Sequence, residues 1–228
     1  MNKIQQQHYL NKESLALKEL DFFFEVVFKR LGQELNLMRE SIFDNYVCHP
    51  TVYEDVFGLN EQAWVGVLNN AIVKAFSDSA DTLQEFTVYN TVNNEKSEIR
   101  TFHGRADLLV LWKNSKGEKV YLLFEAKQYK ESDESKMKED SDAYLENVKN
   151  QALGYIRADK EYFDSRVNLF IVPIIFAWIP EHNLLKIADD YLKSSNEKQE
   201  HFCSLYNECN SGAWVYGTVY DSNGNKLN

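Results

Sequence analysis

The stretch that most constrains the fold of this chain is a predicted β-hairpin at residues 104–128. Its two flanks, residues 104–112 and 120–128, are rich in the β-branched, aromatic and leucine side chains that favour strands. The segment between them contains Asn114 and Gly117, which are typical of turns. A hairpin this apolar predicts a place inside a sheet, so each charged residue in its strands needs an explanation.

Three charged residues interrupt these strands. Asp107 lies near the start of the first strand, whereas Glu125 and Lys127 lie near the end of the second. Because the start of one strand of an antiparallel hairpin lies beside the end of the other, we expect the three side chains to converge. Glu125 and Lys127 are two positions apart, so both side chains should leave the same face of their strand.

Two carboxylates beside a lysine suit metal-assisted hydrolysis of a phosphodiester. Carboxylate oxygens are ligands for Mg²⁺, which keeps room for water and for a substrate phosphate. A neighbouring ammonium can orient the attacking water and stabilise the negative charge of the transition state. The alternative is a salt-bridged pair of strands at the rim of a sheet. An isolated Glu-x-Lys favours that alternative, and the position of Asp107 in the same hairpin favours the metal site.

The charged residues also carry a resemblance to a known family. Asp107 together with Glu125-Ala126-Lys127 resembles the core motif of the PD-(D/E)XK superfamily of nucleases, which have the restriction-endonuclease-like fold. Gln151-Ala-Leu-Gly-Tyr155 resembles the Q-x-x-x-Y motif of the branch that contains the nuclease domains of bacterial recombination helicase–nucleases. The similar segment covers roughly residues 60–180. One residue departs from the pattern, because Ala106 stands where the family name has proline.

The resemblance implies an α/β fold with a mixed central sheet flanked by helices, and a Mg²⁺-dependent nuclease acting on DNA. Asp107 and Glu125 would hold the Mg²⁺, for which Mn²⁺ can substitute, and the carbonyl of Ala126 would be a further ligand. Lys127 would position the water and stabilise the transition state. A catalytically silent module of the same fold, which binds nucleic acid or assembles with proteins, stays open as an alternative.

Further site residues are expected on two helices. In the family, the helix before the core strands often supplies another acidic residue, and Glu61 is the candidate at the start of a predicted helix, residues 61–76. A carboxylate in a first helical turn also suits the helix dipole, so both interpretations stay open, with Glu54 as a weaker alternative. Gln151 and Tyr155 lie one turn apart on another predicted helix and, by the resemblance, would orient the DNA strand.

The rest of the chain predicts the surroundings of this hairpin. We interpret residues 1–50 as a helical N-terminal extension, either packing against the body or forming a dimer surface, and residues 51–228 as the nuclease-like domain. Within 1–50, two helices are expected, separated at Gly32. The other expected elements are a strand at 85–92, a polar loop at 131–142, a helix at 143–158, a buried strand at 167–179, a helix at 184–192 and a strand at 213–220.

Charge and composition limit the partners. A formal net charge of −10 argues against nucleic-acid binding by the whole surface, but residues 96–130 hold eight basic and four acidic residues, which favours a local substrate site. The acidic remainder is compatible with a homo-oligomer or a regulatory protein partner, as in defence or mobile-element systems. No uncharged apolar run approaches about 18 residues, so no membrane association is expected. Three cysteines at spacings that match no zinc pattern, and an N-terminus without a signal sequence, predict a cytoplasmic protein.

Overall fold

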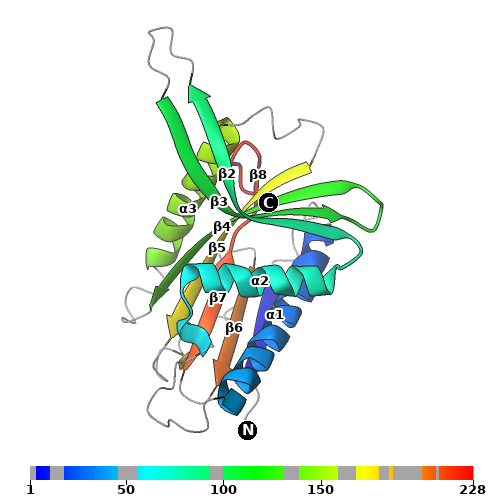
Figure 1. Cartoon of the computed structure of the whole chain (residues 1–228), viewed down its shortest axis with the longest axis vertical. Helices are drawn as coiled ribbons and strands as arrows, with labels where there is room; N and C mark the ends of the chain where they lie inside the picture. Colours follow the sequence, from blue (N-terminus) through cyan, green and yellow to red (C-terminus); the bar gives the residue numbers. More distant parts are fainter. Residues whose placement is uncertain are drawn as a thin grey trace.

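The computed structural model describes residues 4–10, 18–45, 56–92, 100–130, 139–158, 168–179, 185–186, 202–208 and 211–227. In these residues one eight-stranded sheet carries helices on both faces (Figure 1). The elements in chain order are β1 (Gln5–Leu10), α1 (Lys18–Asn45), the 3₁₀ turn η2 (Val56–Gly58), α2 (Glu61–Ala75), β2 (Ala80–Val92), β3 (Arg100–Lys113), β4 (Lys119–Lys130), α3 (Glu139–Ala158), β5 (Asn168–Ile179), β6 (Phe202–Glu208), β7 (Ser211–Gly217) and β8 (Tyr220–Asp221). The predicted α/β class is confirmed.

The sheet is mixed, as predicted. Its strand order is β1-β6-β7-β5-β4-β3-β2, with β8 also paired to β5. β4 and β5 run parallel, and the other paired strands run antiparallel. A parallel pair needs a crossover connection, and α3 lies in that connection. The predicted apolar strand at 167–179 is β5, whose residues from 171 to 177 are all buried, so it forms the centre of the sheet.

The predicted hairpin is formed by β3 and β4, which pair from Lys113 with Lys119 to Leu108 with Phe124. Asn114 shapes the turn between them, because its Oδ1 accepts hydrogen bonds from the backbone N–H groups of Lys116 and Glu118. Gly117 has φ +81°, a conformation that glycine adopts without steric cost.

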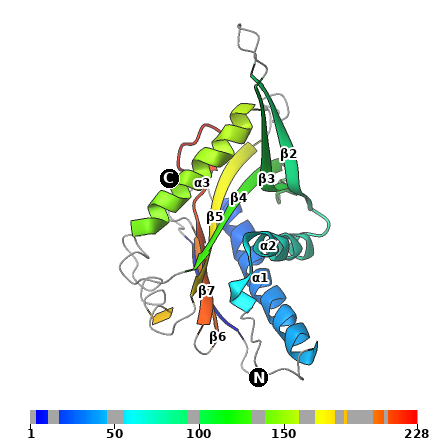
Figure 2. The same ribbon diagram turned by 60° about the vertical axis from the view of Figure 1, so that its left-hand side comes forward.

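The helices divide between the two faces of the sheet. α1 and α2 pack on one face, and α3 packs on the other (Figure 2). Side chains of α1 and α2, among them Phe23, Phe28 and Trp64, are buried with Leu108 and Phe124 of the hairpin. Apolar residues of α3 pack instead against the opposite face of β3, β4, β5 and β7. Both faces of the hairpin are therefore covered, which explains its nearly continuous apolar sequence.

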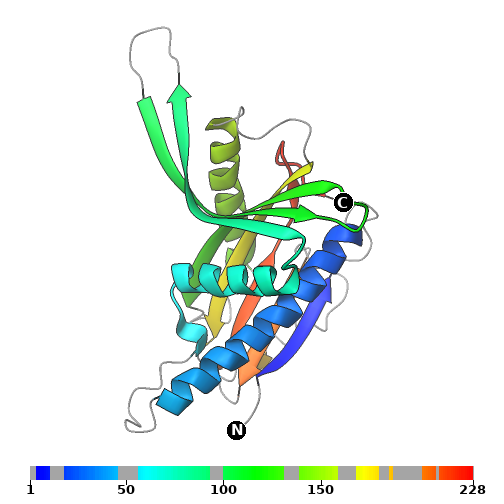
Figure 3. The same ribbon diagram turned by 45° about the vertical axis from the view of Figure 1, so that its right-hand side comes forward.

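The prediction for residues 1–50 is wrong in two respects. Residues 5–10 form a strand, β1, which pairs with β6 at one edge of the sheet (Figure 3). α1 is one helix that continues through Gly32. A Cβ at Gly32 would lie 2.5 Å from Oε1 of Gln6, so Gly32 lies at a close approach of α1 to β1 and does not end a helix. The described part of this region therefore belongs to the sheet and its core.

Other boundaries also differ from those predicted. β2 begins at Ala80 instead of residue 85, and α3 begins at Glu139, inside the predicted polar loop. The predicted strand at 213–220 is divided between β7 and β8, and β6 was not predicted. Most of the predicted helix at 184–192 lies outside the described residues. No helix in the described part of the chain is long and apolar enough to cross a membrane.

Candidate functional site

The candidate site forms where β3 separates from β4. The β3–β4 pairing ends at Leu108 with Phe124, and residues 100–106 of β3 continue with β2 alone in an arm that rises from the body (Figure 1). At the point of separation, Oδ2 of Asp107 accepts a hydrogen bond of 2.7 Å from the backbone N–H of Ala126. The Asp107 side chain therefore accepts the hydrogen bond of a β4 N–H group at a point where the backbones of β3 and β4 are no longer paired. Asp107 thus lies beside Ala126 of β4, as the hairpin predicts, but residues 100–106 of β3 leave β4 and pair with β2.

The same bond orients the carbonyl of Ala126. In an extended strand the N–H and C=O of one residue point to the same side of the strand. Because the Ala126 N–H points to Asp107, we expect its carbonyl to face the same opening between β3 and β4. This orientation is consistent with the predicted use of the carbonyl as a metal ligand.

Glu125 is the most unusual group of the site. It is 2% exposed, and its Oε2 atom has no hydrogen-bond partner among the described residues. Burial, together with the neighbouring Asp107 carboxylate, raises the pKa of this carboxyl to about 9. A charged carboxylate in this position is costly unless a cation lies beside it. The unpaired oxygen and the oxygen donors around it therefore fit a hard divalent cation such as Mg²⁺.

The pKa of the Asp107 carboxyl is also raised by its surroundings. Burial raises the pKa of its carboxyl, the hydrogen bond from Ala126 lowers it, and the nearby carboxylates of Glu61 and Glu85 raise it while Lys127 lowers it. These effects place two further carboxylates and one ammonium close to Asp107. Negative charge therefore exceeds positive charge within the site.

Glu61 is brought into the site by the start of α2. Asn60 caps this helix by accepting a hydrogen bond from the N–H of Ala63. Oε2 of Glu61 lies 3.3 Å from the backbone N–H of Gln128, which donates to it, and 3.3 Å from Nζ of Lys127. Glu61 therefore joins α2 to the end of β4 and holds the lysine of the motif. The candidate Glu54 lies outside the described residues.

Gln151 and Tyr155 reach the site from α3, but their contacts are with the protein. Nε2 of Gln151 donates to the hydroxyl of Tyr155 at 2.8 Å, and that hydroxyl donates to the carbonyl of Arg105 at 3.0 Å. Tyr155 is buried, and burial raises the pKa of its phenol. The pair thus attaches α3 to β3 two residues before Asp107. Their predicted contact with DNA stays a prediction.

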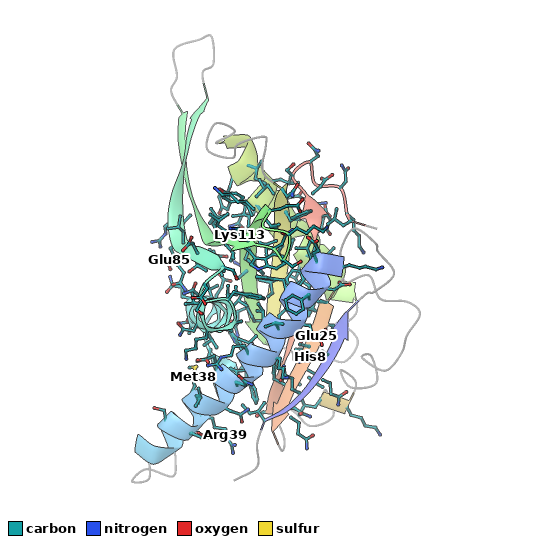
Figure 4. All side chains as sticks on the ribbon, turned by 90° about the vertical axis from the view of Figure 1, so that its right-hand side faces the viewer. His8, Glu25, Met38, Arg39, Glu85 and Lys113 are labelled. Carbon is teal, nitrogen blue, oxygen red and sulfur yellow. The ribbon has the colours of Figure 1, made fainter. Side chains whose placement is uncertain are left out.

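Glu85 and Arg105 were missed by the sequence interpretation. In the β2–β3 register Gln84 pairs with Leu108 and Phe86 with Ala106, but the pair expected between them, Glu85 with Asp107, is absent. Glu85 has φ +46° and is the only non-glycine residue with positive φ in the described part of the chain. Figure 4 shows Glu85 at the base of the arm.

The contacts of Glu85 do not explain why its backbone adopts a strained conformation. Its Oε2 lies 3.1 Å from Nη1 of Arg105, and both side chains are well exposed. An exposed ion pair contributes about 0–1 kcal/mol. A non-glycine residue in the left-handed region costs roughly 1–3 kcal/mol. The ion pair alone does not offset the strain, and strain of this kind concentrates at functional sites.

No family model, curated protein or solved structure matches this chain. Within the described ranges, no group of three or more His, Cys, Asp and Glu side chains is placed to hold a metal ion. The predicted ligand set is of another kind, because it combines the two carboxylates of Asp107 and Glu125 with the backbone carbonyl of Ala126. The assignment therefore depends on the geometry of these groups.

Proposed function

We propose that this chain is a divalent-metal-dependent nuclease with a restriction-endonuclease-like fold, which hydrolyses phosphodiester bonds in DNA. One observation carries the proposal: the buried Glu125 has an oxygen with no partner among the described residues, beside Asp107, where two strands separate. Burying a carboxyl oxygen that has no hydrogen-bond partner costs stability. A bound cation would offset that cost, because it would balance the charge of both carboxylates.

Each site residue then has a defined role. Asp107, Glu125 and the carbonyl of Ala126 would hold Mg²⁺ or Mn²⁺. When bound, such an ion polarises the phosphate and lowers the pKa of a coordinated water. The ammonium of Lys127, which is half exposed, orients the attacking water and balances negative charge on the phosphate. Glu61 keeps this ammonium in place through the ion pair of 3.3 Å.

Gln151 and Tyr155 support the same assignment from α3. Their hydrogen bonds end on the carbonyl of Arg105, so they hold the strand that carries Asp107. A catalytic carboxylate must keep its position closely, because small displacements of reacting groups are costly in rate. These two residues are therefore positioning residues in the proposed nuclease.

The proposal is tested by incubating the protein with labelled linear, circular and single-stranded DNA, and with RNA, in Mg²⁺, Mn²⁺ or EDTA. We expect DNA cleavage with either metal and none in EDTA. Asp107→Ala and Glu125→Gln should abolish cleavage, and Lys127→Ala should slow it by about 10²–10⁴-fold, the usual contribution of a proton-transfer or water-orienting group. Lys116→Ala is the matched control, because Lys116 is an exposed, ion-paired lysine at the other end of the hairpin.

Two results would contradict the proposal. Cleavage that is equal in wild type, Asp107→Ala and Glu125→Gln would come from a contaminating enzyme. Binding of DNA without cleavage in every metal would instead identify a catalytically silent module of the same fold.

A further inference from the structure

Arg105 is held at both ends, which is unusual for an exposed arginine. Its backbone carbonyl accepts the hydrogen bond of 3.0 Å from the Tyr155 hydroxyl, and its guanidinium lies 3.1 Å from the carboxylate of Glu85. Its side chain is nevertheless 62% exposed. Long exposed side chains ordinarily lose entropy when they are fixed, so a restrained and accessible guanidinium is prepared for a ligand.

The ion pair that restrains Arg105 comes from Glu85, at the point where the β2 backbone is irregular, which we call the kink. In the register of the two strands, Glu85 lies across from Asp107, and the ladder is interrupted at this position. Glu85, which has the left-handed φ, pairs its carboxylate with Arg105, and Arg105 is two residues from Asp107 in β3. The kink therefore ion-pairs a cation that lies two residues along β3 from the residue that the proposed function makes a metal ligand.

We propose that Arg105 binds a phosphate of the DNA strand next to the one that is cleaved, and that Glu85 is the positioning residue that presents its guanidinium. This inference rests on the proposed nuclease function and adds a substrate contact to the same site. Arginine suits the role because its planar group can donate two parallel hydrogen bonds to phosphate oxygens.

The charge of the site favours such a contact. The carboxylates of Glu61, Glu85, Asp107 and Glu125 all lie in or beside it, in a chain with a net charge of −10. A DNA strand approaching these groups is repelled unless cations lie along its path. Arg105 and Lys127 are exposed cations that the described structure holds by ion pairs at this point.

The inference is tested by steady-state cleavage of labelled DNA in Mg²⁺ over a range of salt concentrations. Loss of one charge-assisted phosphate contact in Arg105→Ala should raise KM by about tenfold, with a smaller change in kcat. The slope of log KM against log salt should become shallower by about one unit, the effect of one phosphate contact. Arg105→Lys should restore the salt slope but only part of the affinity, because lysine keeps the charge and lacks the planar group.

Two variants of Glu85 separate positioning from simple charge. Glu85→Gln removes the ion pair and should raise KM by a smaller factor than Arg105→Ala. Glu85→Gly also relieves the positive φ, so it should raise the melting temperature while still raising KM. Lys116→Ala, at the distant turn, should leave both KM and the salt slope unchanged.

The outcomes distinguish this inference from the proposed function. If Arg105→Ala lowers kcat or melting temperature and leaves KM and the salt slope unchanged, Arg105 is a structural residue and the inference is overturned. If wild-type protein neither cleaves nor binds DNA, the proposed function and this inference fail together. Saturable Mn²⁺ binding that is unchanged in Arg105→Ala is expected, because the arginine is not a metal ligand.

Discussion

The two ends of the β3–β4 hairpin differ in how far their buried polar groups are hydrogen-bonded. At the turn, Asn114 is 6% exposed, and its side chain both accepts from backbone N–H groups and donates to the carboxylates of Glu19 and Glu118. At the open end, Glu125 is equally buried, but its Oε2 has no hydrogen-bond partner within the described ranges. The same two strands therefore carry one polar group that is fully used by the fold and one that is not.

The charges around these groups differ in the same sense. At the turn, Nζ of Lys116 lies 2.6 Å from Glu19, and this hydrogen bond lowers the pKa of the Glu19 carboxyl. At the open end, burial raises the pKa values of both Asp107 and Glu125. Opposite charges at the turn stabilise the folded chain, whereas the open end keeps carboxylates together at the expense of stability. The comparison indicates that the turn serves the fold, and it supports the proposal that the open end serves a ligand.

The largest expected effect comes from a substitution that removes a charge at the open end without disturbing the strands. In Asp107→Asn the amide oxygen can still accept the hydrogen bond from Ala126, but the charge needed to hold a cation is lost. We expect the single-turnover rate of DNA cleavage in Mg²⁺ to fall on the order of 10³-fold or more, with a melting temperature near that of wild type. A rate within tenfold of wild type would show that this carboxylate is not a metal ligand.

The next effect is a dependence of stability on pH. The carboxyl of Glu125 has a pKa of about 9 when folded and 4.5 in its ordinary surroundings. Between these values the folded state binds more protons than the unfolded state, so the free energy of unfolding should fall as pH rises from 4.5 towards 9 in metal-free buffer. Urea unfolding at several pH values measures this trend, and Glu125→Gln should flatten it. A trend of equal steepness in that variant would assign the dependence to other groups.

At the turn we expect a loss of stability with no loss of chemistry. Asn114→Ala leaves the backbone N–H groups of Lys116 and Glu118 without their acceptor, and should lower the free energy of unfolding by about 2 kcal/mol. Cleavage per folded molecule should stay at the wild-type rate. Parallel urea unfolding and cleavage assays measure both, and a large loss of kcat would show that the two ends are not independent.

The smallest effect concerns the connection from α3. Tyr155→Phe removes the hydrogen bond to the carbonyl of Arg105 and should lower stability by about 1 kcal/mol. Because this bond positions the strand of Asp107, kcat should fall several-fold while KM changes little. Gln151→Ala should have a weaker effect in the same direction, since Gln151 acts through the tyrosine. If KM rises and kcat is unchanged, Tyr155 contacts DNA directly, as the sequence motif implies.

The sequence predicts the arrangement of the proposed site residues better than their surroundings, for physical reasons. The apolar flanks, the turn residues and the antiparallel relation predict that Asp107, Glu125 and Lys127 converge, with no knowledge of the rest of the chain. The predicted start of the helix at residue 61 places Glu61 in its first turn. β1 and the role of Gly32 depend on contacts between distant segments, which local patterns do not contain. The kink at Glu85 is likewise hidden, because its sequence is that of an ordinary strand and its positive φ follows from the tertiary structure.

The most direct test of the central claim is a calorimetric titration of Mn²⁺ into wild-type protein, Asp107→Asn, Glu125→Gln and the turn variant Glu19→Gln. We predict one saturable site in wild type and in Glu19→Gln, and its loss in Asp107→Asn and Glu125→Gln. Equal binding in all four proteins, or no saturable binding in wild type, would contradict the claim that the open end of the hairpin is a site for a divalent cation.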